Sequence, residues 1–234
     1  MNQPRISVII PVYNGERYLA DAIESVLTQS VPPDEILVVD DSSTDGSAVV
    51  AKSFSMVRYL WQPQAGASSA RNHGVRAATS DWLAFLDADD LWSTEKLARQ
   101  RAVLATQSTL DMVFGQVQQF YSPELADDAV SRPARPGREQ MAGYHVGAML
   151  IRRTSFEKVG PFDPQWQVAH FIEWYGRAQK IGLTSLVLPE VVMKRRIHTT
   201  NLGIRAYAQA RVEYVRLMKI MVDQHRLAAG DQAI

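Results

Sequence analysis

The sequence predicts an α/β fold in which helices flank a mainly parallel sheet. The first observation is that short β-branched runs of strand length alternate with stretches of helical periodicity through the first hundred residues. The second is that 46% of the 234 residues are hydrophobic and 21% are charged, which is typical of a globular protein with a substantial core. Strands that alternate with helices at this spacing are joined by right-handed crossovers, and they therefore pair in parallel.

The first half of the chain contains the clearest elements. Its strand-like runs are short and β-branched, so they suit strands that are buried on both faces. Its helix-like stretches repeat apolar residues at helical spacing, as Leu19, Ile23 and Val26 do. In chain order, we expect strand 6–12, helix 15–29, strand 35–40, helix 44–54, strand 57–61, helix 66–78 and strand 82–86.

The second half has a looser pattern. We expect helix 95–107, strand 112–121, a mobile polar loop at 122–143, strand 148–151, helix 171–181, and strands 184–188 and 191–197. The tail at 204–226 reads as an amphipathic helix. Its apolar stripe consists of Ile204, Ala208, Val212, Val215, Met218 and Val222.

Composition narrows the classes of function. Acidic and basic residues number 25 each, so the chain has no overall field for binding nucleic acid, and we expect no nucleic-acid partner. The lack of cysteine excludes disulfides, thiolate zinc sites and cysteine nucleophiles. The N-terminus lacks the pattern of a signal peptide, and the longest apolar runs are strand-sized. We therefore expect a cytoplasmic protein.

Aspartates follow two of the predicted strands. Asp40 and Asp41 end the strand at 35–40, and Asp87, Asp89 and Asp90 follow the strand at 82–86. Open α/β sheets bind their ligands at the carboxyl ends of parallel strands. The two clusters are therefore expected to face one ligand site.

The second cluster has the composition of a metal site. Like charges about 4 Å apart repel by roughly 4 kcal/mol at an effective dielectric constant near 20, so clustered aspartates are costly without a cation. Oxygen ligands without histidine or cysteine favour Mg²⁺ or Mn²⁺ over zinc. The alternative is that Asp89 and Asp90 cap the helix near Glu95 while Asp87 is solvated.

Five motifs in register resemble the inverting family 2 glycosyltransferases, which have the GT-A fold. The motifs are SVIIPVYNG at 7–15 with Tyr18-Leu19, SVLTQS at 25–30, VVDDSSTDG at 38–46, Gly66 with ARNHG at 70–74, and FLDADD at 85–90. The resemblance is close over residues 5–100 and looser as far as Asn201. One departure is Ser42, which stands where glycine is frequent.

The resemblance implies a nucleotide-diphosphate sugar donor. Pro11, Val12 and Tyr13 would line the nucleotide base. Asp41 would accept a hydrogen bond from that base, as in UDP- or dTDP-sugars. Arg71 would lie near the base or diphosphate, although a surface helix arginine is the alternative. Asp87 would face the ribose and donor sugar, and Asp89, with Asp87, would bind Mn²⁺ or Mg²⁺.

The same resemblance divides the chain. It implies a single GT-A domain over 1–234, with a nucleotide-sugar-binding half at 1–110, an acceptor-side half at 111–203 and a helical tail at 204–234. The acceptor would be a glycan or lipid-linked glycan. The tail would cover the domain, form a homodimer or make transient contact with the inner membrane face, and its mixed charges favour packing.

The catalytic base is where the sequence departs most from the family. An inverting transferase needs a base that takes the proton of the acceptor hydroxyl. The family often supplies an aspartate from a Glu-Asp pair before an arginine, but here His170 and Phe171 occupy those positions. Glu173, one helical turn before Arg177, is our candidate base, and an ion pair with Arg177 is its alternative role. His170 is the second candidate, because its usual pKa suits proton transfer.

The missing pair also leaves open a degenerate protein that binds nucleotide sugars without turnover. A sugar-phosphate nucleotidyltransferase is ranked lower, because Pro11-Val12-Tyr13-Asn14 is not a glycine-rich basic loop.

A basic segment near the end of the domain resembles the family's Arg-x-His element beside the diphosphate. It reads KRRIHTTN at 194–201. In a strand, Arg196 and His198 share one face, and we expect them to contact the phosphates. A solvated basic strand end is the alternative. His145 and Gly147 are expected to border the acceptor cleft.

Overall fold

The computed structural model describes residues 4–123, 125, 140–141, 143–199, 201 and 207–230. In this part of the chain, nine strands form one sheet in the order β3-β2-β1-β4-β8-β6-β9-β5, and β7 pairs with β6. The strands are β1 (Ile6–Val12), β2 (Glu35–Asp40), β3 (Val57–Trp61), β4 (Trp82–Phe85), β5 (Leu91–Trp92), β6 (Met112–Tyr121), β7 (Gln140–Met141), β8 (Leu150–Arg152) and β9 (Ser185–Ile197). The predicted α/β fold is confirmed.

The direction of the strands divides the sheet into two parts. Strands β3, β2, β1 and β4 pair in parallel, as the alternation of strands and helices predicts. Beyond β4 the sheet is mixed, because β8 runs antiparallel to β4 and β6 while β9 runs parallel to β6. All the predicted parallel crossovers therefore lie in the first hundred residues.

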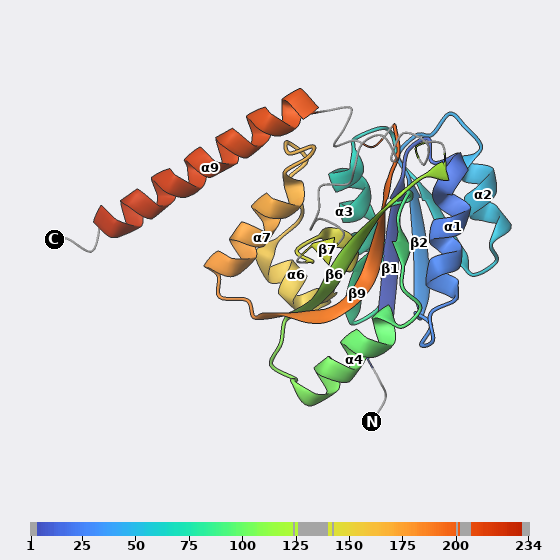
Figure 1. Ribbon diagram of the computed structural model, residues 1–234, viewed down its shortest axis with the longest axis horizontal. Coiled ribbons are helices and arrows are strands. Elements are labelled where there is room, and N and C mark those ends of the chain that lie inside the picture. The colour runs from blue at the N-terminus through green and yellow to red at the C-terminus, as the bar shows by residue number, and fades with distance from the viewer. Residues whose placement is uncertain are drawn as a thin grey trace.

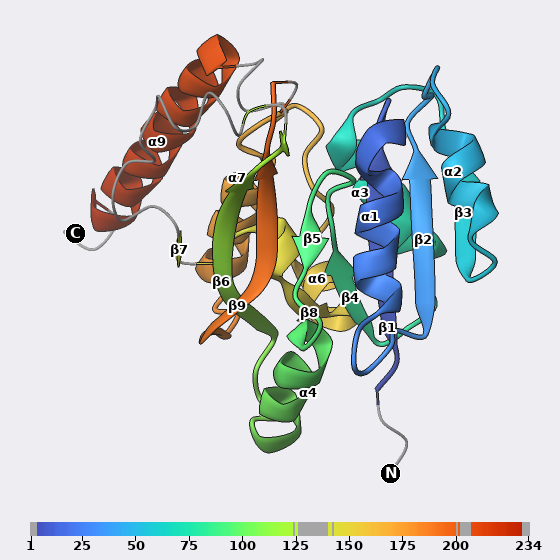
Figure 2. The same cartoon turned by 45° about the vertical axis from the view of Figure 1, so that its right-hand side comes forward.

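Helices cover both faces of the sheet (Figures 1 and 2). They are α1 (Glu16–Leu27), α2 (Ser47–Ser53), α3 (Ala67–Ala77), α4 (Lys96–Thr106), α6 (Arg153–Val159), α7 (His170–Lys180) and α9 (Tyr207–Gly230), with a 3-10 turn at Val146–Ala148. Val8 and Ile10 pack in one buried cluster with residues of α1, α2 and α4. Ile9 packs in the other with residues of α3, α6 and α7. Alternate residues of one strand thus build two cores.

The strand β9 differs from the prediction. The sequence suggests separate strands at 184–188 and 191–197, but β9 is one strand through Pro189. Its pairing with β6 shifts register between Phe114 and Val117, which is the stretch opposite Pro189. Proline has no N–H to donate, so it is accommodated at an irregularity of the ladder rather than ending the strand.

Three further differences concern short or terminal elements. The two-residue strand β5, the 3-10 turn and the seven-residue helix α6 are too short to show a period in the sequence. Most of the loop predicted at 122–143 lies outside the described residues. The predicted tail helix is present as α9, which extends from the body of the protein (Figure 1).

The side of α9 that packs is not the predicted apolar stripe. Val212, Val215 and Met218 are 67%, 69% and 66% exposed, whereas Ala210, Glu213 and Leu217 are buried. Ile204 lies outside the described residues, as do the side chains of Ala208 and Val222. The helix is held by a buried carboxylate as well as by apolar contacts, and apolar periodicity does not report such an interaction.

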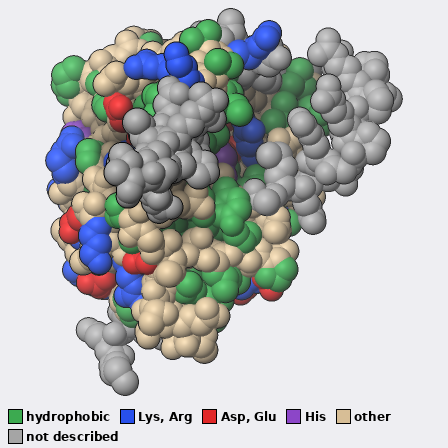
Figure 3. All heavy atoms as spheres, turned by 90° about the vertical axis from the view of Figure 1, so that its left-hand side faces the viewer, with side chains coloured by type: hydrophobic (Ala, Val, Ile, Leu, Met, Phe, Trp, Pro, Cys, Tyr) green, Lys and Arg blue, Asp and Glu red, His purple; other side chains and the backbone are tan. Residues whose placement is uncertain are grey.

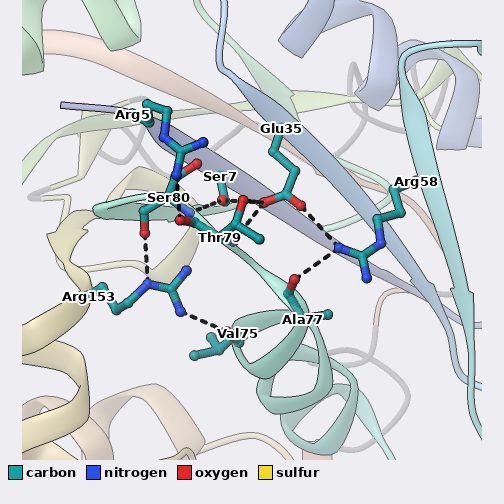
Figure 4. A network of polar contacts seen from close by, with 9 residues as sticks. All are labelled: Arg5, Ser7, Glu35, Arg58, Val75, Ala77, Thr79, Ser80 and Arg153. Atoms are coloured by element: carbon teal, nitrogen blue, oxygen red, sulfur yellow. Dashed lines mark hydrogen bonds and ion pairs between the residues drawn. The ribbon is translucent and has the colours of Figure 1, made fainter. Parts of the chain in front are cut away.

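Polar contacts join neighbouring segments at the amino-terminal edge of the parallel strands (Figure 4). The Glu35 carboxylate accepts hydrogen bonds from the Ser7 hydroxyl at 2.6 Å and the Thr79 N–H at 3.0 Å. Arg58 donates to Glu35 at 3.3 Å and to the Ala77 carbonyl at 3.0 Å. Arg153 donates to the Ser80 carbonyl at 2.7 Å and the Val75 carbonyl at 3.3 Å. These arginines bind carbonyls at the end of α3, where a cation is favoured.

The surface agrees with the balanced composition. Figure 3 shows acidic and basic side chains interspersed on one face rather than gathered by sign. None of the described helices is long and apolar enough to cross a bilayer.

Candidate active site

The two aspartate clusters converge beside the end of β1. Strands β2 and β4 pair with opposite edges of β1, so the loops that follow them flank the turn into α1. The Asp41 N–H donates to the Val12 carbonyl at 2.8 Å. On the other side, a Cβ on Gly15 would lie 3.5 Å from the Cβ of Ala88. The prediction that both clusters lie at the same edge of the sheet is confirmed.

Side chains join the loop after β1 to the loop after β2. Asn14 accepts a hydrogen bond from the Thr44 N–H at 2.8 Å, and Glu16 accepts one from the Gly46 N–H at 2.9 Å. Asn14 and Ser42 have φ angles of +50° and +70°, in the region that favours glycine. This backbone conformation explains why a glycine suits position 42, where this chain departs from the family pattern.

Asp41 organises the loop that leads into α3. The residue is buried, and its carboxylate accepts hydrogen bonds from Gln62 Nε2 at 2.7 Å, the Ala65 N–H at 2.8 Å and the Gly66 N–H at 2.8 Å. Oδ1 takes two of these bonds and Oδ2 takes one. A carboxylate has about four acceptor positions, so Oδ2 retains capacity for a ligand donor.

The residues predicted to line the base differ in accessibility. Pro11 and Val12 are buried within β1, and Val12 packs in the core. Tyr13, the first residue beyond the strand, is 49% exposed. Its ring is the accessible surface at this end of β1.

Arg71, Asp87 and His170 form a connected chain of polar contacts. Arg71 Nη2 donates to Asp87 Oδ1, and Arg71 Nη1 lies 2.9 Å from His170 Nε2. Arg71 is only 3% exposed, so the alternative of a surface helix arginine is wrong. Because a guanidinium can only donate, His170 accepts through Nε2 and its proton is placed on Nδ1.

Burial and the charge of Arg71 set the protonation states of Asp87 and His170. Burial by itself would raise the pKa of Asp87, but the Arg71 guanidinium lowers that pKa to about 2. Burial, together with the charge of Arg71, lowers the pKa of His170 to about 3. At neutral pH, Asp87 is therefore a carboxylate and His170 is a neutral imidazole that orients Arg71.

Asp89 and Asp90 bind the end of β9 rather than capping a helix. Asp89 Oδ2 lies 2.9 Å from His198 Nε2 and 3.2 Å from Asn201 Nδ2. Asp90 Oδ1 accepts from the Arg196 N–H at 2.8 Å. Burial and the nearby charges of Asp89 and Asp87 raise the pKa of Asp90 well above its ordinary value. The three carboxylates thus share one region of negative potential.

Arg196 and His198, the predicted phosphate contacts, are buried and bound to other residues of the protein. They share a face of β9, as expected, but that face is turned towards α1, and both residues are buried. The Arg196 guanidinium lies between the rings of Tyr18 and Phe120 and donates to Asp21 Oδ2 at 2.8 Å. It also donates to the Asp89 carbonyl at 3.0 Å. Through these contacts and the contact between His198 and Asp89, the pair holds the Asp89 loop in place.

Arg195, on the opposite face of β9 from Arg196, is a second cation near the site, besides Arg71. Burial lowers the pKa of His145 to about 4, Asp87 opposes that shift, and Arg195 and Arg71 add to it. The charge of Arg195 also acts on Asp90. Arg195 could have been found from the sequence, because successive residues of a strand face opposite sides and Arg195 therefore faces away from Arg196.

His145, which we expected to border the acceptor cleft, lies near the charged residues of the site. Its Nδ1 accepts a hydrogen bond from the Gly147 N–H at 3.1 Å. The fields of Asp87, Arg195 and Arg71 at its ring place it among the charged residues of both halves of the chain.

Glu173 is engaged by Arg177. Arg177 Nε donates to Glu173 Oε1 at 2.7 Å, and Nη2 donates to Oε2 at 3.0 Å. The same arginine donates to the carbonyls of Val159 and Pro161, so it ties α7 to the segment before it. This is the ion pair that the sequence offered as the alternative to catalysis.

The carboxylates fit a divalent cation that is shared with a ligand. Among the described residues, no group of three or more acidic or histidine side chains is poised to hold a metal ion. Asp89 Oδ1 and Asp87 Oδ2 make no hydrogen bond within that part of the chain. Mg²⁺ and Mn²⁺ sites are commonly built from one or two carboxylates completed by phosphate oxygens and water. The donor set therefore fits such an ion when a diphosphate is present.

Proteins with related sequences are glycosyltransferases by name. The model described as glycosyl transferase family 2 matches residues 7–160. An uncharacterized glycosyltransferase of Rickettsia typhi is 26% identical over 96% of this chain and 74% of its own length. An uncharacterized glycosyltransferase of a Nostoc species is 36% identical over 70% of this chain and 56% of its own length. The chain thus spans only part of the length of these relatives.

Solved structures share the fold. The crystal structure of S. aureus TarS 1-349 has a TM-score of 0.66 at 18% identity, and the match covers 82% of this chain and 60% of that one. The mannosyltransferase PcManGT of Pyrobaculum calidifontis, in complex with GDP-Man and Mn²⁺, has a TM-score of 0.66 at 22% identity over 88% of this chain and 60% of its own. The chain therefore belongs to glycosyl transferase family 2 and has the GT-A fold.

Proposed function

We propose that this glycosyltransferase moves a sugar from a UDP- or dTDP-sugar to a hydroxyl group of a glycan or lipid-linked glycan, with inversion at the anomeric carbon. The observation that carries the proposal is the convergence of Asp41, Asp87 and Asp89 on the turn after β1. This is the edge of an α/β sheet at which nucleotides bind. The buried Arg71 guanidinium and the nearby charge of Arg195 also suit an anionic donor.

The features at the base end of the site support a pyrimidine. The exposed Tyr13 ring offers a surface for stacking, and Asp41 Oδ2 is an acceptor for the N–H of uracil or thymine. Structures of TarS are known in complex with UDP and with UDP-GlcNAc, whereas PcManGT is in complex with GDP-Man. A carboxylate acceptor beside an aromatic ring also fits the family resemblance in this half of the chain.

Asp89 and Asp87 would hold Mn²⁺ or Mg²⁺ together with the donor diphosphate. The ion would neutralise the diphosphate and stabilise it as a leaving group. Arg195 would add a cation to the same region, because its charge acts on Asp90 and His145.

The transfer is a single displacement. A bond forms between the acceptor oxygen and the anomeric carbon as the bond from that carbon to the diphosphate oxygen breaks. The hydroxyl proton passes to Glu173, and the nucleoside diphosphate leaves with the electron pair. The two contacts with Arg177 use about half of the acceptor positions of Glu173, so the carboxylate retains room for a hydroxyl. His170, which is neutral and bound to Arg71, orients the donor side.

A second candidate is a nucleotide-sugar-binding protein without turnover. It is favoured by the engagement of both predicted bases, since Arg177 holds Glu173 and the low pKa of His170 makes that imidazole a weak proton acceptor. This candidate shares the donor site and lacks only the proton transfer.

A thermal-shift screen combined with a turnover assay separates these functions. We expect UDP- or dTDP-sugars with Mn²⁺ to raise the melting temperature, and we expect a chelator or Asp89→Ala to remove most of that shift. Release of the nucleoside diphosphate from the stabilising donor, lost in Glu173→Gln, supports transfer. Stabilisation without turnover supports the binding protein. The absence of stabilisation by every nucleotide sugar contradicts the donor site.

A further inference from the structure

The C-terminal helix α9 reaches the candidate active site through one buried carboxylate. Glu213 accepts hydrogen bonds from the backbone N–H groups of Gln167 at 3.1 Å, Val168 at 2.9 Å and Ala169 at 2.9 Å. The residue is 7% exposed. Burial by itself would raise the pKa of Glu213, but these three hydrogen bonds lower it. A charged carboxylate therefore sits where α7 begins, which is the favoured end of a helix for an anion.

The surrounding contacts fix the position of this carboxylate. Leu217 forms a small apolar cluster with Trp166 and Ala169. Arg216 lies over the Trp166 ring, 5.2 Å from its centroid. On the preceding turn of α9, Gln209 Nε2 donates to Glu213 Oε1 at 3.1 Å. The contact thus combines a charge, an aromatic ring and apolar packing around one turn.

The turn held by Glu213 is followed directly by His170, which belongs to the network of polar contacts with Arg71 and Asp87. Ala169 is the N-cap of α7, and His170 is the first residue of that helix. His170 contacts Arg71, and Arg71 pairs with Asp87. A displacement of the turn moves the imidazole and, through Arg71, the carboxylate that would face the donor. One peptide bond, from Ala169 to His170, and two polar contacts connect the turn to Asp87.

A second residue in the C-terminal part of the chain, Asn201, contacts Asp89 of the acidic cluster. Asn201 donates to Asp89 Oδ2 at 3.2 Å and to the Arg196 carbonyl at 3.1 Å. The C-terminal part of the chain therefore contacts the site at both the Asp89 side and the His170 side.

We propose that Glu213 is a positioning residue for the transferase, which sets His170, Arg71 and Asp87 in the geometry that the donor requires. The inference rests on the proposed donor site. It makes α9 a part of the active enzyme rather than an appendage, because the helix supplies the anion that the start of α7 needs. Small displacements of positioning groups are enough to slow a reaction by one or two orders of magnitude.

The test compares Glu213→Ala and Glu213→Gln with Val212→Ala, a matched change on the exposed side of the same helix. Calorimetric titration of each full-length protein with UDP and Mn²⁺ gives the number of competent sites and the Kd. Turnover of the donor is then expressed per competent site, at a temperature well below the melting transition of every variant.

We expect Glu213→Ala to lower kcat per competent site by roughly ten-fold. Glu213→Gln, which retains one oxygen acceptor, should recover part of this loss, and Val212→Ala should match the wild type. A purely structural role would change the number of sites but not kcat per site, and an unchanged kcat per site in Glu213→Ala would overturn the inference.

Amide hydrogen exchange tests the coupling without any donor. Faster exchange in Glu213→Ala should extend from residues 167–171 to residues 86–90, which include Asp87. Faster exchange confined to α9 and residues 167–169 would contradict the coupling. If the wild type binds no UDP while the exchange spreads to 86–90, the proposed donor is wrong and the positioning inference still holds.

Discussion

At the scale of single residues, neighbouring cations in β9 have opposite roles. Arg196 is buried between two aromatic rings and pairs with Asp21, so it holds the Asp89 loop against α1. Arg195, one residue earlier, acts on the charged groups of the site. Successive side chains of a strand point to opposite faces. Arg196 therefore lies on the face that packs against α1, and Arg195 lies on the other face.

Substitution of these two arginines should separate stability from binding. We expect Arg196→Ala to lower the free energy of unfolding by about 1–3 kcal/mol, because the Asp89 carbonyl loses its hydrogen-bond donor and the guanidinium between two rings is removed. Arg195→Ala should leave the melting temperature close to that of the wild type and weaken UDP binding by about ten-fold, or about 1.4 kcal/mol. Chemical denaturation and calorimetric titration measure the two effects. Unfolding of the protein by Arg195→Ala would contradict this prediction, because it would give Arg195 the structural role.

A buried lysine gives the chain a pH dependence of its own. Lys96 is fully buried, donates to Gln100 Oε1 at 2.7 Å and lies over the Trp92 ring. Burial lowers the pKa of Lys96 well below its ordinary value. Lys96 therefore binds its proton more tightly in the unfolded chain than in the folded protein. Its contribution to the free energy of unfolding then rises with pH, from the lowered folded pKa up to the unfolded pKa of about 10.4.

We expect Lys96→Met to remove this component. Between pH 7 and pH 10, the free energy of unfolding of the wild type should rise relative to that of Lys96→Met. Denaturant unfolding at several pH values measures the difference. A constant difference across that range would show that the lysine is charged to the same extent in both states.

At the scale of elements, the prediction succeeded where periodicity is long and failed where it is short. Strands β2, β3 and β6 have the predicted bounds, because each is a strand-length run enriched in β-branched or aromatic residues. The strand β5, with two residues, carries no period, and Pro189 suggested a break that the irregular pairing of β9 with β6 avoids. The packing side of α9 was missed because a charged residue anchors it.

The helix α7 depends on one large aromatic side chain. Trp174 is fully buried, stacks with Phe156 and Phe171, and donates through Nε1 to the Gly160 carbonyl at 2.9 Å. We expect Trp174→Ala to lower the free energy of unfolding by about 3–5 kcal/mol, because a cavity replaces the indole. Thermal and denaturant unfolding check the effect. A loss below about 1 kcal/mol would mean that α7 repacks, and His170 would then lose its fixed position.

At the scale of the whole molecule, the two edges of the parallel strands differ in what their polar groups do. At the amino-terminal edge, Glu35 accepts from Arg58 and the Ser7 hydroxyl, and Arg58 and Arg153 also donate to backbone carbonyls within α3 or just after it. At the other edge, Asp87 and Asp89 each retain a carboxylate oxygen that makes no hydrogen bond within the described chain. Carboxylate oxygens without a hydrogen bond in the described residues therefore lie at the edge where the donor would bind.

The location of the site could be predicted from sequence, but the roles of its residues could be predicted only in part. Asp41, Asp87 and Asp89 lie at the expected edge because the end of a parallel strand fixes where the next residue goes. Asp41 bonds to residues 62–66, and His198 bonds to Asp89, through contacts between segments far apart in the chain. Such pairings depend on loop geometry, which no local pattern encodes.

The central claim is that the two carboxylate loops form one donor site, completed by a metal ion that the protein alone does not hold tightly. The most direct test is electron paramagnetic resonance of Mn²⁺ titrated into the protein with and without UDP. We predict about one tightly bound Mn²⁺ per chain only when UDP is present, and loss of that binding in Asp89→Asn. Tight Mn²⁺ binding that needs no UDP, or that survives in Asp89→Asn, would contradict the claim.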